Sequence, residues 1–245
     1  MDIYSFCVQW AANHAGTRPI RVLDYGCGAG QIVKALRERG IEAFGCDVYY
    51  DGGDYSSAVD PVLFGSAILR MEGGIIPFDT ASFDAVINNQ VLEHVEDLDV
   101  VLAEISRVLR PGGTVLSLFP DAGVWREGHC GIPFLHWFPK RSRPRVYYAA
   151  ALRACGLGYH KGDKTALQWS RDFCDWLDQW TYYRSVRAIN SSFQTRFGAM
   201  LPVEEKFLQF RLGRRAGLAR ACPVWLQRWI VRKLGGRMFE ARKKG

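Results

Sequence analysis

The sequence lacks any run of about 18 apolar residues, so we expect no membrane-spanning helix. Its seven cysteines are odd in number, and no two have the C-x-x-C spacing of zinc or thiol-redox motifs. It also lacks a basic leader, so we expect no signal peptide. These absences favour a cytoplasmic protein with reduced thiols, and they exclude a disulfide framework as the source of its stability.

Basic residues are scarce in the first half of the chain, and acidic residues are scarce in the second half. Residues 1–120 hold 8 Lys and Arg against 16 Asp and Glu, whereas residues 121–245 hold 24 against 9. Seven of the eight tryptophans also lie in the second half. The asymmetry indicates two segments with different tasks, and the basic half is typical of a segment that meets an anionic partner or surface.

Short apolar runs alternate with helical patterns through the first half. The expected strands are 21–24, 43–47, 83–88 and 114–119, and the expected helices are 4–14, 31–40 and 97–109. This alternation predicts an α/β fold, a Rossmann-like doubly wound and mostly parallel sheet. Ligands of such sheets bind beyond the carboxyl ends of the strands.

The second half predicts a helical substrate extension after the sheet. A helix over 147–156 and a strand over 157–160 are expected to complete the sheet, and a helix over 168–188 and one from Pro223 are expected to follow. We therefore divide the chain into a core of residues 1–160, with a lid insertion at 121–145, and a basic extension of residues 161–245.

A glycine-rich turn follows the first expected strand, at Asp24-Tyr-Gly-Cys-Gly-Ala-Gly30. Such a turn lets the backbone approach a ligand at the next helix N-terminus, although many turns need glycine for their backbone angles alone. The dinucleotide pattern G-x-G-x-x-G would place its third glycine at Gln31, which disfavours NAD. Asp47 ends the next strand, where it could accept hydrogen bonds from ribose hydroxyls or simply form a turn.

Three blocks of the sequence resemble the motifs of a known enzyme family. VLDYGCGAG resembles motif I of the class I S-adenosylmethionine (SAM) dependent methyltransferases, of the type 11-like group. IPFDTASFDAVINNQVLEHVED resembles the family's stretch through strand 4, and RVLRPGG its loop before strand 5. The resemblance covers about residues 20–120 and implies SAM as the cofactor.

The resemblance also implies roles for individual residues. Asp24 would orient the motif I loop and the methionine amino group, and Asp47 would hold the ribose. Asn88 would lie near the methionine part of the cofactor. The glycines expected to line the cofactor are Gly26, Gly28 and Gly30, and the residues expected near the adenine are Met71 and Glu72.

The stretch Gln90-x-x-Glu93-His94 resembles a Glu-x-x-Glu-His arrangement of some quinone-pathway O-methyltransferases, which could bind a metal. Gln90 replaces the first acid and removes one anionic ligand. We therefore expect no metal here, and we expect Glu93 and His94 to cap and pack the turn.

The insertion at 121–145 begins where strand 5 ends, above the expected methyl donor, so we interpret it as a substrate lid. A hydroxyl acceptor needs a base, and histidine suits that task near neutral pH. The candidates, in order, are His129, Glu127 and His136. The basic run 140–145 could hold a phosphate or be a solvated loop.

The tail from 206 to 245 has 12 Lys and Arg and a single acid, Glu240. From Pro223 onward an apolar stripe that includes Trp225, Trp229 and Met238 predicts an amphipathic helix. Residues 222–240 could contact an anionic membrane on its inner face, or dock on their own domain and expose only charge.

The sequence therefore predicts a methyltransferase that acts on a hydroxyl of a sugar, a lipid-linked glycan or a secondary metabolite. The acceptor is thus a small molecule or a glycolipid, and it could bear a phosphate. An RNA or protein methyltransferase that uses the basic face is one alternative, and a non-catalytic SAM-binding scaffold is another. Nucleic acid is disfavoured, because no nucleic-acid-binding module is recognisable and the NPPY-like motif of base-modifying enzymes is absent at Asn88-Asn-Gln-Val91.

Overall fold

The computed structural model describes residues 2–244. Seven strands form one sheet in the order β3-β2-β1-β4-β5-β7-β6. The first five are mutually parallel, β7 runs antiparallel to β5, and β6 runs antiparallel to β7. The strands are β1 (Arg21–Tyr25), β2 (Glu42–Asp47), β3 (Ile68–Arg70), β4 (Phe83–Asn89), β5 (Leu109–Phe119), β6 (Leu201–Pro202) and β7 (Arg237–Arg242). The predicted doubly wound, mostly parallel sheet is confirmed.

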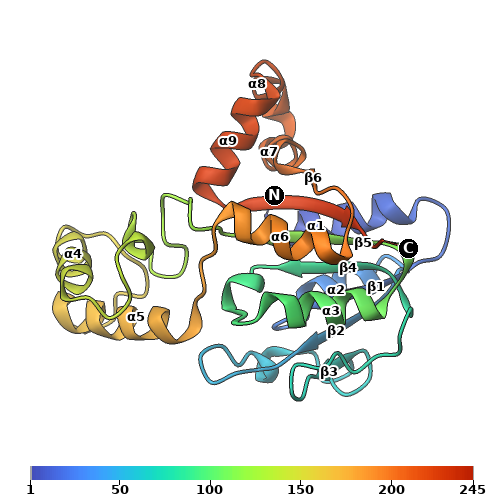
Figure 1. Ribbon diagram of the computed structural model, residues 1–245, viewed down its shortest axis with the longest axis horizontal. Helices are drawn as coiled ribbons and strands as arrows, with labels where there is room; N and C mark the ends of the chain where they lie inside the picture. Colours follow the sequence, from blue (N-terminus) through green and yellow to red (C-terminus); the bar gives the residue numbers. More distant parts are fainter. Residues whose placement is uncertain (1, 245) are drawn as a thin grey trace.

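Helices cover both faces of this sheet (Figure 1). One face packs on α1 (Ile3–Ala15), α2 (Gln31–Arg37) and α7 (Glu204–Leu212), and the other packs on α3 (Leu98–Val108) and α6 (Val186–Arg196). Successive residues of a strand point to opposite faces, so Val22 joins the first core and Leu23 the second. The expected helices at 4–14, 31–40 and 97–109 are confirmed to within a few residues.

A side lobe lies beyond the end of the sheet in Figure 1 and has its own small core. It contains α4 (Arg143–Ala154) and α5 (Ala166–Trp180), with Trp169 and Leu177 buried against Cys130 and Leu135 of the 121–145 insertion. The aromatic stripe of α5 therefore packs on the insertion rather than on the sheet.

The expected strand at 157–160 is wrong. These residues form no strand, because Tyr159 N–H donates to the Cys130 carbonyl at 2.8 Å and Gly158 packs closely on the Trp169 ring. The sheet is completed instead by β7, which reaches β5 after Gly236; a Cβ at Gly236 would lie 2.5 Å from the Phe119 carbonyl oxygen. Met238, expected on the helical stripe, lies in β7.

The expected helix at 168–188 is two helices. It breaks at Thr181, and α6 begins at Val186. The Arg184 guanidinium donates to the carbonyls of Leu92, Val95 and Glu96, and Tyr182 N–H donates to the Glu93 carbonyl. These long-range bonds hold the segment extended across the end of β4.

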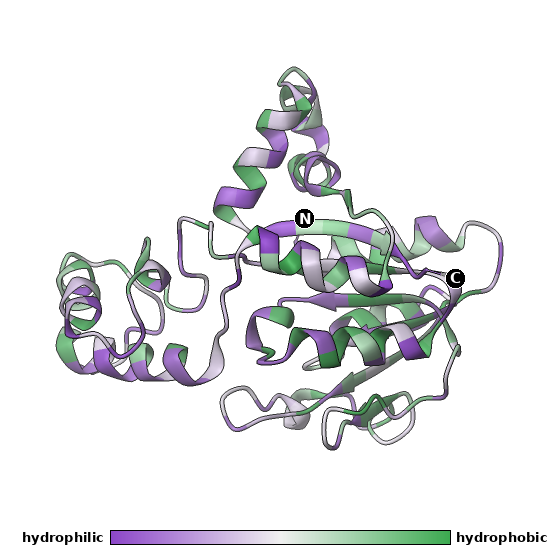
Figure 2. Ribbon diagram, in the orientation of Figure 1, coloured by the Kyte–Doolittle hydropathy of each residue, from purple (hydrophilic) through white to green (hydrophobic). Residues whose placement is uncertain are grey.

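The last helices form a projection beside the sheet: α7, α8 (Ala216–Arg220) and α9 (Val224–Leu234) (Figure 1). In α9 only Gln227 and Val231 are buried, while Trp225 and Trp229 are exposed. The hydropathy colouring of Figure 2 shows apolar residues alternating with polar ones along this projection. Within residues 2–244, no helix is both long enough and apolar enough to cross a bilayer.

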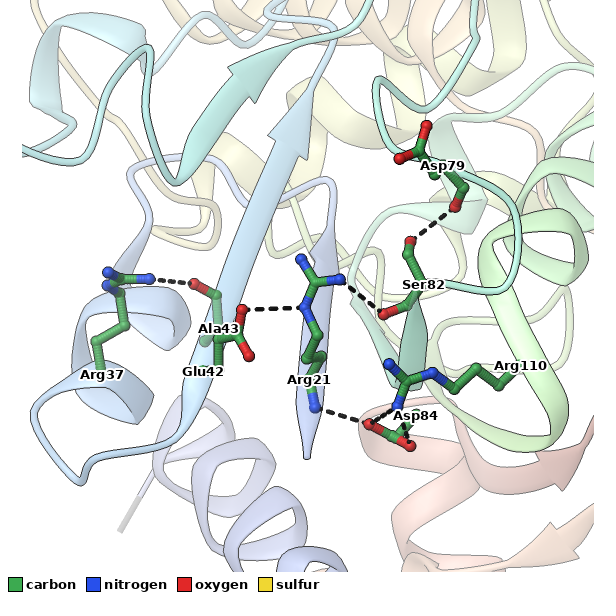
Figure 3. Close-up of polar contacts among 8 residues, drawn as sticks. All are labelled: Arg21, Arg37, Glu42, Ala43, Asp79, Ser82, Asp84 and Arg110. Atoms are coloured by element: carbon green, nitrogen blue, oxygen red, sulfur yellow. Dashed lines mark hydrogen bonds and ion pairs between the residues drawn. The ribbon is translucent and has the colours of Figure 1, made fainter. Parts of the chain in front are cut away.

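The amino-terminal edge of the sheet is held by paired charges (Figure 3). Arg21 Nε donates to Glu42 Oε1 at 3.0 Å, and its backbone N–H donates to Asp84 Oδ2 at 2.8 Å. Arg110 donates to both carboxylate oxygens of Asp84 at 2.9 Å. These contacts join the starts of β1, β2, β4 and β5, and they leave the opposite edge as the place for ligands.

Candidate active site

Three acidic and amide side chains gather at the carboxyl edge of the sheet. Asp24 and Asn88 lie near the ends of the neighbouring strands β1 and β4, and both are buried. Asp47 ends β2 and is half-buried. The parallel topology therefore brings together the three polar residues that the sequence assigned to one ligand.

The three glycines of the turn have different structural reasons. A Cβ at Gly26 would lie 2.4 Å from the branched Val91 side chain, and one at Gly30 would lie 2.3 Å from the end of the Ile68 side chain. Both residues also have positive φ, at +72° and +76°, which favours glycine. A Cβ at Gly28 would meet only Tyr55, at 3.9 Å. Gly28 is thus the glycine whose bare backbone leaves an open approach, and its N–H donates to Asp47 Oδ2 at 2.8 Å.

The buried polar atoms here fit a ligand that carries an ammonium group. Asn88 Nδ2 donates to Ser117 Oγ at 2.9 Å, whereas Asn88 Oδ1 is buried with no partner among the described residues. Burial, and then the charge of Asp47, raise the pKa of Asp24 well above its usual range. A bound cation would give both groups a partner, as the methionine part of SAM does.

The predicted adenine residues lie beside the β2 end. Met71 is buried, and its N–H donates to the Asp47 carbonyl at 2.8 Å. Glu72 follows it and is exposed. Their role toward an adenine stays a prediction.

The insertion places His129 against a buried carboxylate. Glu127 is fully buried, and its Oε1 lies 2.6 Å from His129 Nδ1 and accepts a hydrogen bond from the Tyr183 hydroxyl at 2.6 Å. Its Oε2 accepts the Cys130 N–H at 2.7 Å. Although burial opposes it, these partners lower the pKa of Glu127 to about 2, so the residue is a carboxylate. For His129, burial lowers the pKa, but the hydrogen bond and negative charge of Glu127 raise it more, so the net shift is upward.

His94, at the end of β4, faces the same ring. Its Nε2 lies 3.2 Å from His129 Nε2, and its Nδ1 lies 2.6 Å from the Trp180 carbonyl oxygen. A carbonyl can only accept, so His94 carries its proton on Nδ1; Glu127 imposes the same tautomer on His129. Two neutral rings would then turn lone pairs toward each other, so the contact calls for a cation between them. A proton on His129 would supply this positive charge. It would not sit on His94, because burial lowers the pKa of His94 to about 4.

Glu93 is the third group of this cluster. One oxygen or nitrogen atom from each of Glu93, His94 and His129 lies within 4.8 Å of the others. Both carboxylate oxygens of Glu93 are buried without a partner among residues 2–244, and burial raises its pKa to about 7. The three residues could hold a metal ion, each histidine oriented through its other nitrogen, as metal-bound histidines are. The expectation that Glu93 and His94 merely cap and pack the turn therefore misses their contact with the insertion.

His136 and the basic run lie at the rim. The His136 ring lies tilted against the Tyr183 ring with centroids 4.6 Å apart, so it contacts the Glu127 partner rather than Glu127 itself. In the run 140–145, Lys140 Nζ donates to the carbonyls of Asp178 and Thr181, and buried Arg145 pairs with the Asp178 carboxylate. These two residues hold the side lobe together, while Arg141 and Arg143 remain exposed.

Sequence reasoning missed Tyr183 and the aromatic wall around the histidines. Trp176 lies 5.1 Å from the His129 ring and 5.9 Å from the His94 ring, centroid to centroid. Tyr50, in the loop after β2, lies 4.8 Å from the Trp180 ring and 6.0 Å from the His94 ring. The helical spacing of Trp169, Trp176 and Trp180 in the sequence predicts only a buried helix face, and no local signal links Tyr183 to Glu127.

Comparisons with known proteins agree with this geometry. Residues 23–117 match the family model of a methyltransferase domain. The ubiquinone biosynthesis O-methyltransferase of human mitochondria is 32% identical over 42% of this chain and 30% of its own length. That of Pseudomonas aeruginosa is 30% identical over 46% of this chain and 50% of its own. The chain thus spans half or less of the length of these relatives.

Solved structures show the same fold over nearly the whole chain. A SAM-dependent methyltransferase from Mesorhizobium loti has a TM-score of 0.53 and 18% identity, covering 98% of this chain and 99% of that one. A didemethyltoxoflavin N1-methyltransferase from Burkholderia thailandensis has a TM-score of 0.51 and 16% identity, covering 99% and 78%. The sheet and these structures show a class I methyltransferase fold, and residues 23–117 carry the methyltransferase-domain match. The chain is similar to the SAM-dependent methyltransferases through residues 23–117.

Proposed function

We propose that the chain transfers a methyl group from SAM to a hydroxyl oxygen, with His129 as the general base. One observation carries the proposal: the insertion holds His129 against a buried carboxylate and against His94 of the core. The O-methyltransferase names of the similar proteins support an oxygen acceptor. The roles of Asp24, Asp47 and Asn88 toward the cofactor are part of the same proposal.

The chain's own residues would act mainly by positioning and by moving one proton. SAM, when bound, supplies an electrophilic methyl group on a sulfonium. During this transfer the neutral form of His129 would take the hydroxyl proton at Nε2, and the sulfur of SAM would leave as the neutral thioether of its product. The resulting imidazolium lies between Glu127 and the His94 Nε2 lone pair, both of which favour the charged ring. Both contacts would stabilise the positive charge that develops on the ring in the transition state, and such stabilisation accelerates a reaction.

The acceptor is proposed by class. A hydroxyl on a sugar, a lipid-linked glycan or a secondary metabolite remains our choice, and exposed Arg141 and Arg143 could meet a phosphate on it. Residues 121–145 would act as the lid, and the parts of residues 161–245 that lie outside the sheet and its cores would act as the substrate extension. We also propose a cytoplasmic location, with peripheral membrane contact through residues 222–240.

Cofactor binding is tested by thermal unfolding with SAM, S-adenosylhomocysteine, NAD and NADP. Ligand at about 100 times its dissociation constant should raise the free energy of unfolding by roughly 2.7 kcal/mol. We expect this with SAM and its product. Stabilisation by NAD alone would contradict the assignment, and stabilisation by SAM without turnover on any hydroxyl acceptor would favour a binding scaffold.

The base is tested with His129→Ala. Turnover should fall on the order of 10²- to 10⁴-fold, because the proton loses its acceptor, while stabilisation by SAM stays unchanged. His160→Ala is the matched control, since His160 is an exposed histidine of the side lobe. Assays run with and without EDTA separate the two uses of the cluster. Turnover that EDTA abolishes and zinc restores would mean that His129 is a ligand and not the base.

A further inference from the structure

Exposed aromatic side chains from two distant segments lie in a row on the surface. Trp225 and Trp229 lie four residues apart on the same face of α9, with 69% and 44% of their surfaces exposed. The Trp229 ring packs edge-on against Trp125 of the insertion, with centroids 5.2 Å apart. Trp125 is itself exposed, so the contact does not bury the pair.

The row continues along the insertion. Phe134 N–H donates to the Trp125 carbonyl at 2.8 Å, and the Phe134 ring lies 4.7 Å from the exposed Trp137 ring. Single exposed apolar residues are ordinary, but a connected row of large ones marks an interaction surface. We call Trp125, Phe134, Trp137, Trp225 and Trp229 the aromatic strip.

Unpaired positive charge lies at the tip of the same helical projection. Arg228 and Arg232 of α9 are neutralised by Glu205 and Glu204 of α7. The arginines around α8 have no such partner: each is exposed and makes no ion pair with any residue from 2 to 244. These are Arg211, Arg214, Arg215 and Arg220. Figure 1 shows α8 at the outermost end of the projection, so this charge stands away from the sheet.

We propose that the α8 arginines and the aromatic strip bind the surface of an anionic lipid bilayer. Tryptophan prefers the boundary between headgroups and acyl chains, and arginine is attracted to the negative headgroups. Two exposed aliphatic residues favour a bilayer over a nucleic acid: Leu218 and Leu234, exposed by 69% and 66%, could enter the acyl boundary but have no hydrogen bonds to offer bases or phosphates. A second copy of the chain is disfavoured because the basic tips would repel each other.

This surface also reaches the candidate active site. Trp125 and Phe134 flank Glu127 and His129 on one insertion, and Trp125 N–H donates to the Lys233 carbonyl of α9 at 2.9 Å. If the proposed methyl transfer holds, the bilayer contact would set the lid at the membrane, where it could take a lipid-borne acceptor. Binding to vesicles is measured without turnover, so the two proposals fail separately.

Co-sedimentation of the full chain with vesicles tests the surface. We expect binding to phosphatidylcholine vesicles that contain phosphatidylglycerol, and little binding to pure phosphatidylcholine. Arg214→Ala with Arg215→Ala should weaken partitioning on the order of 30-fold. Each arginine near an anionic surface contributes a similar favourable free energy of binding, so the effects of losing two arginines multiply. Trp225→Ala with Trp229→Ala should weaken vesicle partitioning more than the two arginine changes do. This loss should persist at high salt.

Matched controls use exposed residues elsewhere. Arg18→Ala with Arg39→Ala removes two exposed charges near α1 and α2, and Tyr147→Ala removes an exposed aromatic residue of α4. Both should bind vesicles like the unchanged chain. Equal losses in controls and test variants would overturn the proposal. So would binding of single-stranded RNA through the same arginines with no binding to either vesicle.

Discussion

The two edges of the sheet treat charge in opposite ways. At the amino-terminal edge, Arg21 and Arg110 pair with Glu42 and Asp84, and these side chains are partly open to water. At the carboxyl edge, Asn88 Oδ1 and both oxygens of Glu93 are buried without a partner among the described residues. A buried polar group without a partner destabilises the fold, whereas a hydrated ion pair changes its stability little. The cost at one edge points to function there, because a ligand could supply the missing partners.

The shifted pKa values follow the same division. At the carboxyl edge, burial raises the pKa of Asp24 well above its usual range and that of Glu93 to about 7, while the partners of Glu127 lower its pKa to about 2. Two of these carboxyl pKa values are therefore shifted upward and the third is shifted downward. Carboxyl groups whose environments push their pKa values apart are typical of sites with acid and base roles.

The largest effect should come from Glu127→Gln. The change keeps the size of the side chain but removes the charge that raises the pKa of His129. Turnover should fall on the order of 10³-fold, since the imidazolium loses its counter-charge. The acidic limb of the pH profile of kcat/KM should also move to lower pH, because a weaker base loses its proton earlier. Glu42→Gln at the opposite edge is the control and should leave the profile in place. An unmoved limb in Glu127→Gln would mean that His129 is not the base.

Glu93→Gln should produce the next largest effect, on stability. A carboxyl group whose folded pKa is raised from its usual 4.5 to about 7 contributes stability below pH 4.5 that is lost as the pH rises through 7. The variant carries no such charge, so it should be as stable as the unchanged chain near pH 4.5 and more stable by roughly 3 kcal/mol at pH 8. Urea unfolding at several pH values, with EDTA present, measures the difference. A constant difference across this pH range would show that Glu93 is not a buried, unpartnered carboxyl.

Local patterns predicted the acidic half of the molecule well. Strands β1, β2, β4 and β5 are short apolar runs bounded by turns, and parallel topology alone places Asp24, Asp47 and Asn88 at one edge. The sequence also singled out Glu127 and His129, but as alternative candidates for the base; their hydrogen bond to each other was not predicted.

The features of the structure that the sequence did not predict depend on long-range contacts. Tyr183 bonds to Glu127 across 56 positions, and no periodicity records such a pairing. The helix expected over 168–188 ends early because Arg184 binds carbonyls at the end of β4. Met238 fits the helical stripe by spacing, yet the Gly235-Gly236 pair ends the helix and the next residues pair with β5. In each case tertiary hydrogen bonds outweigh a local preference.

The smallest effect belongs to the amino-terminal edge and completes the comparison. Arg21→Ala removes the pair with Glu42, the bond to the Ser82 carbonyl and the stacking on Phe44 at 4.9 Å. Because the pair is partly hydrated, the free energy of unfolding should fall by only about 1 kcal/mol, as seen in urea unfolding. Turnover and stabilisation by SAM should not change, since this edge holds strands together and touches no ligand. Arg21→Lys, which keeps the charge but not the planar stacking, separates the two contributions. A loss of turnover in Arg21→Ala would show that the two edges are coupled through β1 and that the division between them does not hold.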